Sequence, residues 1–101
     1  MKAVVIAAAA AALLLSAGVA SASEALAKKD MCFACHDVAK KKIGPSYQDI
    51  AKKYKGDPKA AEHLEHAIVH GGKGVWGPIP MPPQPRAAGD AKALAAWILS
   101  M

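Results

Sequence analysis

Hydrophobic residues recur at helical spacing from residue 23 onward, and glycine and proline residues divide this part of the chain into four segments. The first predicted helix covers about residues 24–31 and leads directly into Cys32. A second helix is predicted after Ser46, because Ser46 and Asp49 have the spacing of a capping box. Its residues predicted to face inward are Tyr47, Ile50, Ala51 and Tyr54. No strand-like alternation is present, so the sequence predicts an all-α fold.

A third helix is predicted to begin at Asp57-Pro58, a capping residue followed by a proline at the first helical position, and to end before Gly71-Gly72. The residues predicted to line its inner face are Ala61, Leu64 and Ile68. The segment from residue 74 to residue 85 contains five prolines, which exclude a helix and a central strand. This segment is therefore predicted to be a loop, either ordered or disordered.

The last predicted helix covers about residues 89–99. The residues at helical spacing on its inner face are Ala91, Leu94, Ala95 and Ile98, with Trp97 beside them. Ala87 and Ala88 stand where a serine or aspartate cap is expected, so the start of this helix is predicted to be poorly capped.

The first 22 residues have the organisation of an export signal. Met1-Lys2 gives a positive start, residues 3–15 are all apolar, and Ala20-Ser21-Ala22 fits the pattern that signal peptidase accepts. Cleavage after Ala22 would release residues 23–101 as one domain, and export predicts a periplasmic protein without a membrane anchor. The alternative is that the uncharged residues 3–22 stay as an anchor, because a membrane-spanning helix needs roughly 20 residues.

Size and charge limit what this domain can be. A domain of roughly 80 residues buries too little surface to be securely stable, and it usually needs a staple or a cofactor. The formal net charge is +5, and loss of Lys2 with the signal lowers it to +4. We expect a monomer whose positive surface steers it to an acidic redox partner. Nucleic acid is an unsuitable partner, because the chain carries no recognised binding motif.

Cys32 and Cys35 are the two cysteines of the chain. A disulfide between them would close a very short loop and add little stability. A redox-active pair is the main rival interpretation, but such motifs accompany a βαβ pattern, which is absent from the sequence. Together with His36 they form the spacing CxxCH, which is the attachment signature of c-type haem. One helical turn would present both thiols and the imidazole to the same haem.

The sixth iron ligand decides between an electron carrier and a catalyst. Met81 lies 45 residues after His36 in the proline-rich loop, and a stiff loop suits a weak thioether ligand. Met81 could instead fill a gap in the core, and His70 is the competing ligand. Met31 adjoins the attachment site and Met101 ends the chain. The remaining histidines, His63 and His66, fall on one helix face with His70 and are predicted to be solvated. Adventitious metal binding by the three is the alternative, although no cysteine or carboxylate cluster completes a site.

Four features in order resemble the short bacterial class I cytochromes c. They are CxxCH, Gly44-Pro45-Ser46-Tyr47, the string from Gly74 to Pro83 that contains Trp-Gly-Pro-Ile-Pro-Met-Pro-Pro, and the segment from Leu94 to Leu99. The resemblance covers essentially residues 23–101. It implies four short helices around one haem c that is held by two thioethers, with the first and last helices packed across each other.

The same resemblance implies residue roles. Cys32 and Cys35 would carry the thioethers, and His36 and Met81 would be the axial iron ligands. Pro45 would accept a hydrogen bond from His36, and Trp76 would donate one to a haem propionate. The expected function is one-electron transfer without substrate chemistry.

The resemblance also implies the class of partner. These are respiratory proteins such as a nitrite reductase, a terminal oxidase, a cytochrome c peroxidase or a membrane cytochrome complex. A haem peroxidase or gas sensor with an open sixth position, and a thiol oxidoreductase without haem, remain as alternatives.

Overall fold

The computed structural model describes residues 23–101, so the predicted signal peptide at residues 1–22 lies outside the described residues. Residues 23–29 are helical and precede a short 3-10 helix, η1. The elements that follow the first helical segment are η1 (Cys32–Ala34), α2 (Tyr47–Tyr54), α3 (Ala60–His70), η2 (Pro85–Ala87) and α4 (Ala91–Leu99). Within residues 23–101 there is no β-strand, and the prediction of an all-α fold is confirmed.

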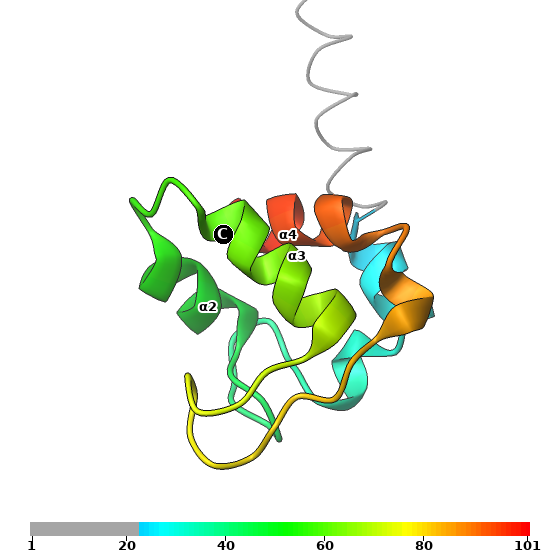
Figure 1. The fold of residues 1–101 in the computed structure, drawn as a ribbon, viewed down its shortest axis with the longest axis horizontal. Coiled ribbons are helices and arrows are strands. Elements are labelled where there is room, and N and C mark those ends of the chain that lie inside the picture. Colours follow the sequence, from blue (N-terminus) through cyan, green and yellow to red (C-terminus); the bar gives the residue numbers. More distant parts are fainter. Residues whose placement is uncertain (1–22) are drawn as a thin grey trace, which may run out of the picture.

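Helix α4 packs against both α3 and α2. Figure 1 shows the loop that follows α3 on the same side of the molecule as the segment that precedes α2. Both irregular segments therefore lie on the same side of the helices. Among residues 23–101, no helix is both long enough and apolar enough to span a membrane.

Helix α2 begins as the sequence predicts. The hydroxyl oxygen of Ser46 accepts a hydrogen bond from the backbone N–H of Asp49 at 3.1 Å, which is half of the predicted capping box. The side chains of Tyr47, Ile50 and Ala51 are buried, as predicted. Tyr54 is only partly buried, because it is the last residue of the helix.

Helix α3 begins at Ala60, later than the predicted start at Asp57-Pro58. A carboxylate oxygen of Asp57 accepts a hydrogen bond from the N–H of Lys59 at 2.8 Å and closes a separate turn before the helix. Asp57 thus caps a turn and not the helix itself.

The prediction that Ala61 faces inward is wrong. Ala61 is exposed, and its neighbour Ala60 is buried with Leu64 and Ile68. These three residues are four positions apart, so they form one stripe along the helix, and the side of α3 that packs against α4 is rotated away from Ala61.

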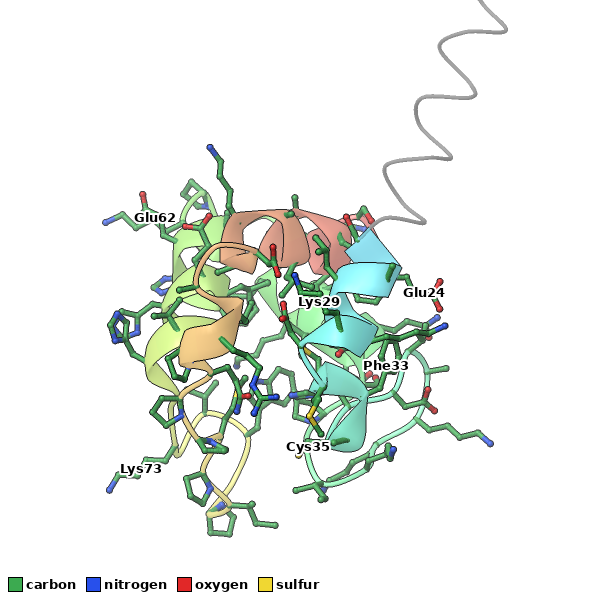
Figure 2. All side chains as sticks on the ribbon, turned by 90° about the vertical axis from the view of Figure 1, so that its right-hand side faces the viewer. Glu24, Lys29, Phe33, Cys35, Glu62 and Lys73 are labelled. Atoms are coloured by element: carbon green, nitrogen blue, oxygen red, sulfur yellow. The ribbon has the colours of Figure 1, made fainter. Side chains whose placement is uncertain are left out.

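Helix α4 begins at Ala91, and a three-residue turn at 88–90 separates it from the 3-10 helix η2. Its four predicted inner residues are all buried, which confirms that part of the prediction. The cap residue is Asp90, whose side chain makes no capping hydrogen bond. The Asp90 carboxylate instead lies 3.3 Å from the Lys29 ammonium of the first helical segment (Figure 2). The helix thus begins two residues later than predicted, and its cap is an aspartate and not an alanine, although this cap makes no side-chain hydrogen bond.

Two clusters of buried side chains form the core. One contains Ala27, Ile68, Ala87, Ala91 and Leu94, and the other contains Tyr47, Ile50, Leu64, Ala95 and Ile98. The first and last helices meet in the first cluster, which confirms that they pack together. Four of these ten core residues are alanines, which contribute little apolar surface each, so the protein side chains alone make a thin core.

The first helical segment ends at residue 29, before the predicted end at Met31. Met31 has a φ of 63°, in the left-handed region that L-residues with a side chain rarely adopt. This conformation stops the helix and turns the chain into η1, which begins at Cys32. The attachment turn is therefore a separate element and not a continuation of the first helix.

Asp30 is a buried carboxylic acid at this same junction. The residue is only 2% exposed, and its Oδ2 atom has no hydrogen-bond partner among the described residues. Burial raises the pKa of Asp30, and the neighbouring carboxylate of Asp90 raises it further, while Lys29 and Arg86 act in the opposite direction. The folded protein therefore holds the Asp30 proton more tightly than the unfolded chain does.

Replacement of this carboxyl by an amide tests the effect. The stability that Asp30 contributes is present below its unfolded pKa of 3.8 and is lost as pH rises through the higher folded pKa. We expect Asp30→Asn to stabilise the holoprotein at neutral pH by up to about 1 kcal/mol, with no gain in acid. Urea unfolding at both pH values measures this difference. Lower stability of the variant at neutral pH would contradict the assignment.

Candidate functional site

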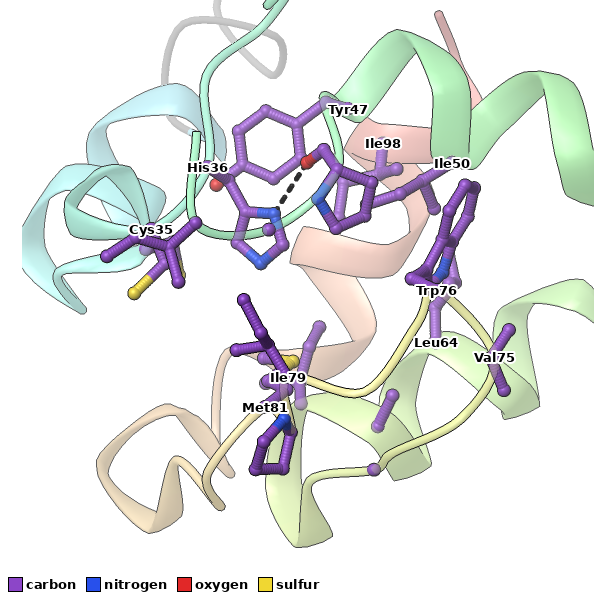
Figure 3. A pocket seen from close by; sticks show the side chains of 18 of the residues that line it. Cys35, His36, Tyr47, Ile50, Leu64, Val75, Trp76, Ile79, Met81 and Ile98 are labelled. Carbon is purple, nitrogen blue, oxygen red and sulfur yellow. Dashed lines mark hydrogen bonds between the residues drawn. The ribbon is translucent and has the colours of Figure 1, made fainter. Parts of the chain in front are cut away.

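A cavity of about 380 Å³ lies between the attachment turn, the loop that follows α3, and the helices. His36 and Cys35 lie on one side of it, and Met81 and Ile79 lie on the facing side (Figure 3). Apolar side chains of α2, α3 and α4, including Ile50, Leu64 and Ile98, also line it. The cavity thus brings together segments that lie far apart in the sequence.

One turn of the chain carries both cysteines and the histidine. The carbonyl of Cys32 accepts hydrogen bonds from the N–H of Cys35 at 3.2 Å and from the N–H of His36 at 3.0 Å. Both cysteines are free thiols and are partly buried. Since all three side chains line the same cavity, the turn presents two thiols and one imidazole to a single ligand.

The environment of Cys32 does not suit thiol exchange chemistry. Burial raises the pKa of the Cys32 thiol, and the nearby Asp30 carboxylate adds to this effect. Redox-active CxxC motifs work through a thiol whose pKa is lowered, because the thiolate is the nucleophile. This site therefore argues against a thiol oxidoreductase.

The ring of His36 is held in one orientation and one tautomer. Its Nδ1 atom lies 2.7 Å from the carbonyl oxygen of Pro45, and because a carbonyl only accepts, Nδ1 must donate the proton. The ring also stacks on Tyr47, with centroids 5.4 Å apart and planes 27° apart. The other ring nitrogen, Nε2, therefore keeps a free lone pair, as a metal ligand requires.

The Tyr47 ring that supports His36 stays neutral. Tyr47 is buried, and burial raises the pKa of its hydroxyl, with further contributions from Cys32 and Asp37. The ring also contacts Phe33 and Trp97 edge-on, at 5.6 and 5.1 Å between centroids. Tyr47 thus connects the attachment turn to α4 through aromatic packing.

Gly44 lies directly against the His36 ring. A Cβ atom at this position would stand 2.5 Å from Cε1 and 2.9 Å from Nδ1 of His36, closer than side chains tolerate. The N–H of Gly44 donates to the carbonyl of Cys35 at 2.7 Å, which keeps the two segments together. In the sequence Gly44 only signals a loop, and its role becomes visible through this contact.

The loop that carries Met81 is ordered, which decides between the two sequence alternatives. Gly72 and Met81 form an isolated antiparallel bridge with backbone hydrogen bonds of 3.1 and 2.8 Å. Gly71, with a φ of 74°, leaves no room for a Cβ beside the backbone of Met81 and Pro83. The N–H of Gln84 donates to the carbonyl of Ile68 at 2.9 Å. These contacts fix both ends of the loop to α3.

The competing ligand candidates do not face His36 as Met81 does. Met31 is on the attachment side, and its sulfur lies 3.1 Å from Arg86 Nη1. Met101 is partly exposed at the chain end, and His70 is exposed on α3; neither lines this cavity. Of the residues considered from the sequence, Met81 is the one that faces His36 across the cavity (Figure 3).

Trp76 marks the other end of the loop. Its side chain lines the cavity and is 43% exposed, and the Lys53 ammonium lies 5.5 Å from its ring centroid. This distance allows a cation–π contact that holds the indole against α2. Trp76 therefore forms part of the cavity wall while the residue itself remains exposed to solvent.

The cavity has the chemistry of a haem site. It is mainly apolar, it has two thiols on one turn, and it places an imidazole with a free Nε2 opposite a thioether. A thin protein core with such a cavity also fits a domain that is completed by a large flat cofactor.

Comparisons with known proteins agree with this geometry. The family model described as cytochrome c matches residues 20–101. The chain is 53% identical over 85 residues to cytochrome c-552 of Hydrogenobacter thermophilus, covering 84% of this chain and 87% of that protein. Cytochrome c-551 of Pseudomonas aeruginosa is 43% identical over 88 residues, covering 87% and 85% of the two chains.

A solved structure supports the same assignment. The crystal structure of wild-type Nitrosomonas europaea cytochrome c552 is similar with a TM-score of 0.74 and 51% identity, covering 76% of this chain and 96% of that one. This chain therefore belongs to the cytochrome c family, as a small electron-carrier haem protein that binds haem c covalently.

Proposed function

We propose that this chain is a periplasmic one-electron carrier in which His36 and Met81 are the two axial ligands of the haem iron. The observation that carries the proposal is the placement of the free His36 Nε2 and the Met81 side chain on facing sides of one cavity. The haem supplies one-electron chemistry, because its iron alternates between Fe(II) and Fe(III).

Cys32 and Cys35 would hold the cofactor through two thioether bonds. Their thiols project from the same turn as His36, so covalent attachment and proximal ligation are positioned together. The hydrogen bond to Pro45 raises the basicity of His36 as a ligand and prevents its ring from rotating.

The Met81 loop compensates for the weakness of a thioether ligand. Prolines restrict the free loop, and the Gly72–Met81 bridge together with Gly71 fixes its ends, so little conformational entropy is lost when Met81 binds. His/Met ligation raises the reduction potential, and the apolar lining of the cavity adds to this effect.

Trp76 would donate its indole N–H to a haem propionate. Its position at the side of the cavity, with its ring held by Lys53, supports this role. Such a bond offsets part of the cost of burying a carboxylate.

An enzyme with an open sixth position, such as a haem peroxidase or a gas sensor, is the competing function. Two filled axial positions would leave no site for a substrate or a gas, so the proposal predicts no substrate chemistry. The relatives named above are cytochromes by name. The Met81 variant described below separates the two functions.

The partner would be an acidic redox protein that docks where the cavity opens. Lys41 and Lys73 line the cavity together with the exposed side chains of Val75 and Ile79. Positive charge around an apolar centre suits rapid electrostatic encounter followed by close contact. The candidates are a nitrite reductase, a terminal oxidase, a cytochrome c peroxidase and a membrane cytochrome complex.

We propose export to the periplasm by the segment at residues 1–22.

Loss of the Met81 sulfur tests the distal ligand. Met81→Ala should abolish the far-red charge-transfer band of a methionine–iron(III) bond and allow carbon monoxide to bind the reduced protein. The potential should fall by more than about 59 mV, which is tenfold in the equilibrium between the two redox states. Absorbance spectra and redox titration measure these changes.

Met31→Ala and Met101→Ala are the matched controls, and both should keep the band. If the band survives in Met81→Ala, the distal assignment fails, and His70→Gln becomes the next variant to measure.

A methyl group at Gly44 tests how His36 is positioned. Gly44→Ala should force the imidazole or the Pro45 segment to move and destabilise the holoprotein by about 2 kcal/mol. Gly89→Ala is the control, because a Cβ there meets no atom within 4 Å and the backbone is not in the left-handed region. Denaturant unfolding compares the two variants. Equal stabilities would contradict a close fit at Gly44.

Removal of charge tests the docking surface. Lys73→Gln should slow electron transfer to an acidic partner at low ionic strength. The difference in rate from wild type should shrink with added salt, because the Debye length falls from about 30 Å at 0.01 M to about 8 Å at 0.15 M. Lys28→Gln is the control, since Lys28 lies 3.6 Å from Glu24 on the first helical segment. Stopped-flow rates that respond equally to both variants would argue against this surface.

A further inference from the structure

The outer face of α3 carries two histidines that the electron-transfer site does not use. His66 and His70 are one helical turn apart and both are exposed, and their ring centroids lie 4.7 Å apart with planes inclined by 42°. Neither lines the cavity that holds His36 and Met81. The sequence alone suggested solvated side chains, whereas the structure places the two rings in contact.

Two imidazoles at positions i and i+4 of a helix can bind one metal ion, and zinc peptidases use this spacing in their HExxH helix. Rings whose centroids are 4.7 Å apart need only side-chain rotation to direct one nitrogen each to a common ion. The helix backbone holds their Cα atoms in place, so binding orders little besides the two side chains.

We propose that His66 and His70 form a binding site for a divalent transition metal on the exposed face of α3, with Cu²⁺ preferred over Zn²⁺. Imidazole nitrogen suits both ions, and Cu²⁺ stands at the top of the affinity order for divalent first-row metals. No group of three His, Cys, Asp or Glu residues in the described part of the chain forms a ready-made metal site. Water therefore completes the coordination, and the affinity is modest.

Glu62 adds negative charge to the same face. It lies one turn before His66, is exposed, and projects outward from the molecule (Figure 2). His63, although close in sequence, points to other partners: its Nε2 lies 3.7 Å from Asp57, and its ring lies 6.0 Å from that of Tyr54. His63 thus provides a control residue on the same helix.

The site lies directly before Gly71, where the loop that carries Met81 begins. His70 is the last residue of α3, and the following N–H of Gly71 donates to the carbonyl of Ala67 at 2.9 Å. A metal that joins His66 to His70 holds the last helical turn closed. We therefore expect metal binding to slow hydrogen exchange of the Gly71 amide, a readout that is separate from electron transfer.

Titration of the oxidised holoprotein with Zn²⁺ by calorimetry tests the proposal, and Cu²⁺ is added in parallel with detection by electron paramagnetic resonance. The ferric protein is used because it cannot reduce Cu²⁺. We expect one equivalent to bind, with nitrogen coupling in the Cu²⁺ spectrum. His66→Gln and His70→Gln should each weaken binding at least about tenfold, which is 1.4 kcal/mol, and His63→Gln should bind as wild type does.

Three outcomes would overturn the proposal. These are the absence of binding at millimolar metal, affinities of His66→Gln and His70→Gln equal to that of wild type, and an equal loss in His63→Gln. Unchanged haem spectra of all three variants confirm that each is folded, so a weakened affinity reports on the site itself. Because Met81 and His36 are intact in every variant, failure here is distinct from failure of the proposed ligation.

Discussion

The hydrogen bond from His36 Nδ1 to the Pro45 carbonyl is the contact on which the rest of the site depends. It fixes the ring, assigns the proton to Nδ1 and leaves Nε2 free to bind iron. The residues around Pro45 all support it. Gly44 gives the ring space, Ser46 caps α2, and Tyr47 stacks on the ring. One short segment thereby joins the attachment turn to the helical core.

Because the protein core is thin, the stability of the fold depends on the cofactor that fills this site. Alanines make up a large part of the buried residues, and they let α3 and α4 approach closely while contributing little apolar surface each. The side chains of Leu64 and Ile98 serve both the core and the cavity wall. A large apolar cofactor therefore completes the same core that positions its ligands, and cofactor loss should also lower stability.

Strain and buried charge concentrate at the junction before the attachment turn. Met31 adopts a left-handed backbone conformation, and Asp30 is buried with one oxygen that has no hydrogen-bond partner within residues 23–101. Both are costly for an isolated segment. They persist because the chain on either side of the junction is packed into the fold: Ala27 belongs to one buried cluster, and Cys32 and Phe33 pack against that cluster. The result is a sharp turn that separates the first helix from the cysteines.

The sequence by itself determined the features that depend only on residues close together in the chain. The CxxCH turn, the helical segments and the buried face of α4 all follow from spacings of a few residues, and the proline-rich loop follows from composition. Similarity to a known family extended this local information to Pro45. These features were predictable because a helical turn fixes residues three and four apart whatever surrounds it.

Only the tertiary structure decided the features that join distant segments. The choice of Ala60 over Ala61 for the inner face depends on how α3 lies against α4. The fit of Gly71 against the backbone of Met81 and Pro83 depends on a loop that folds back to its own start. The contact between the His66 and His70 rings likewise depends on rotamers that no spacing specifies. Such contacts depend on how all the elements pack in the fold, and the conformational preferences of individual residues do not determine that packing.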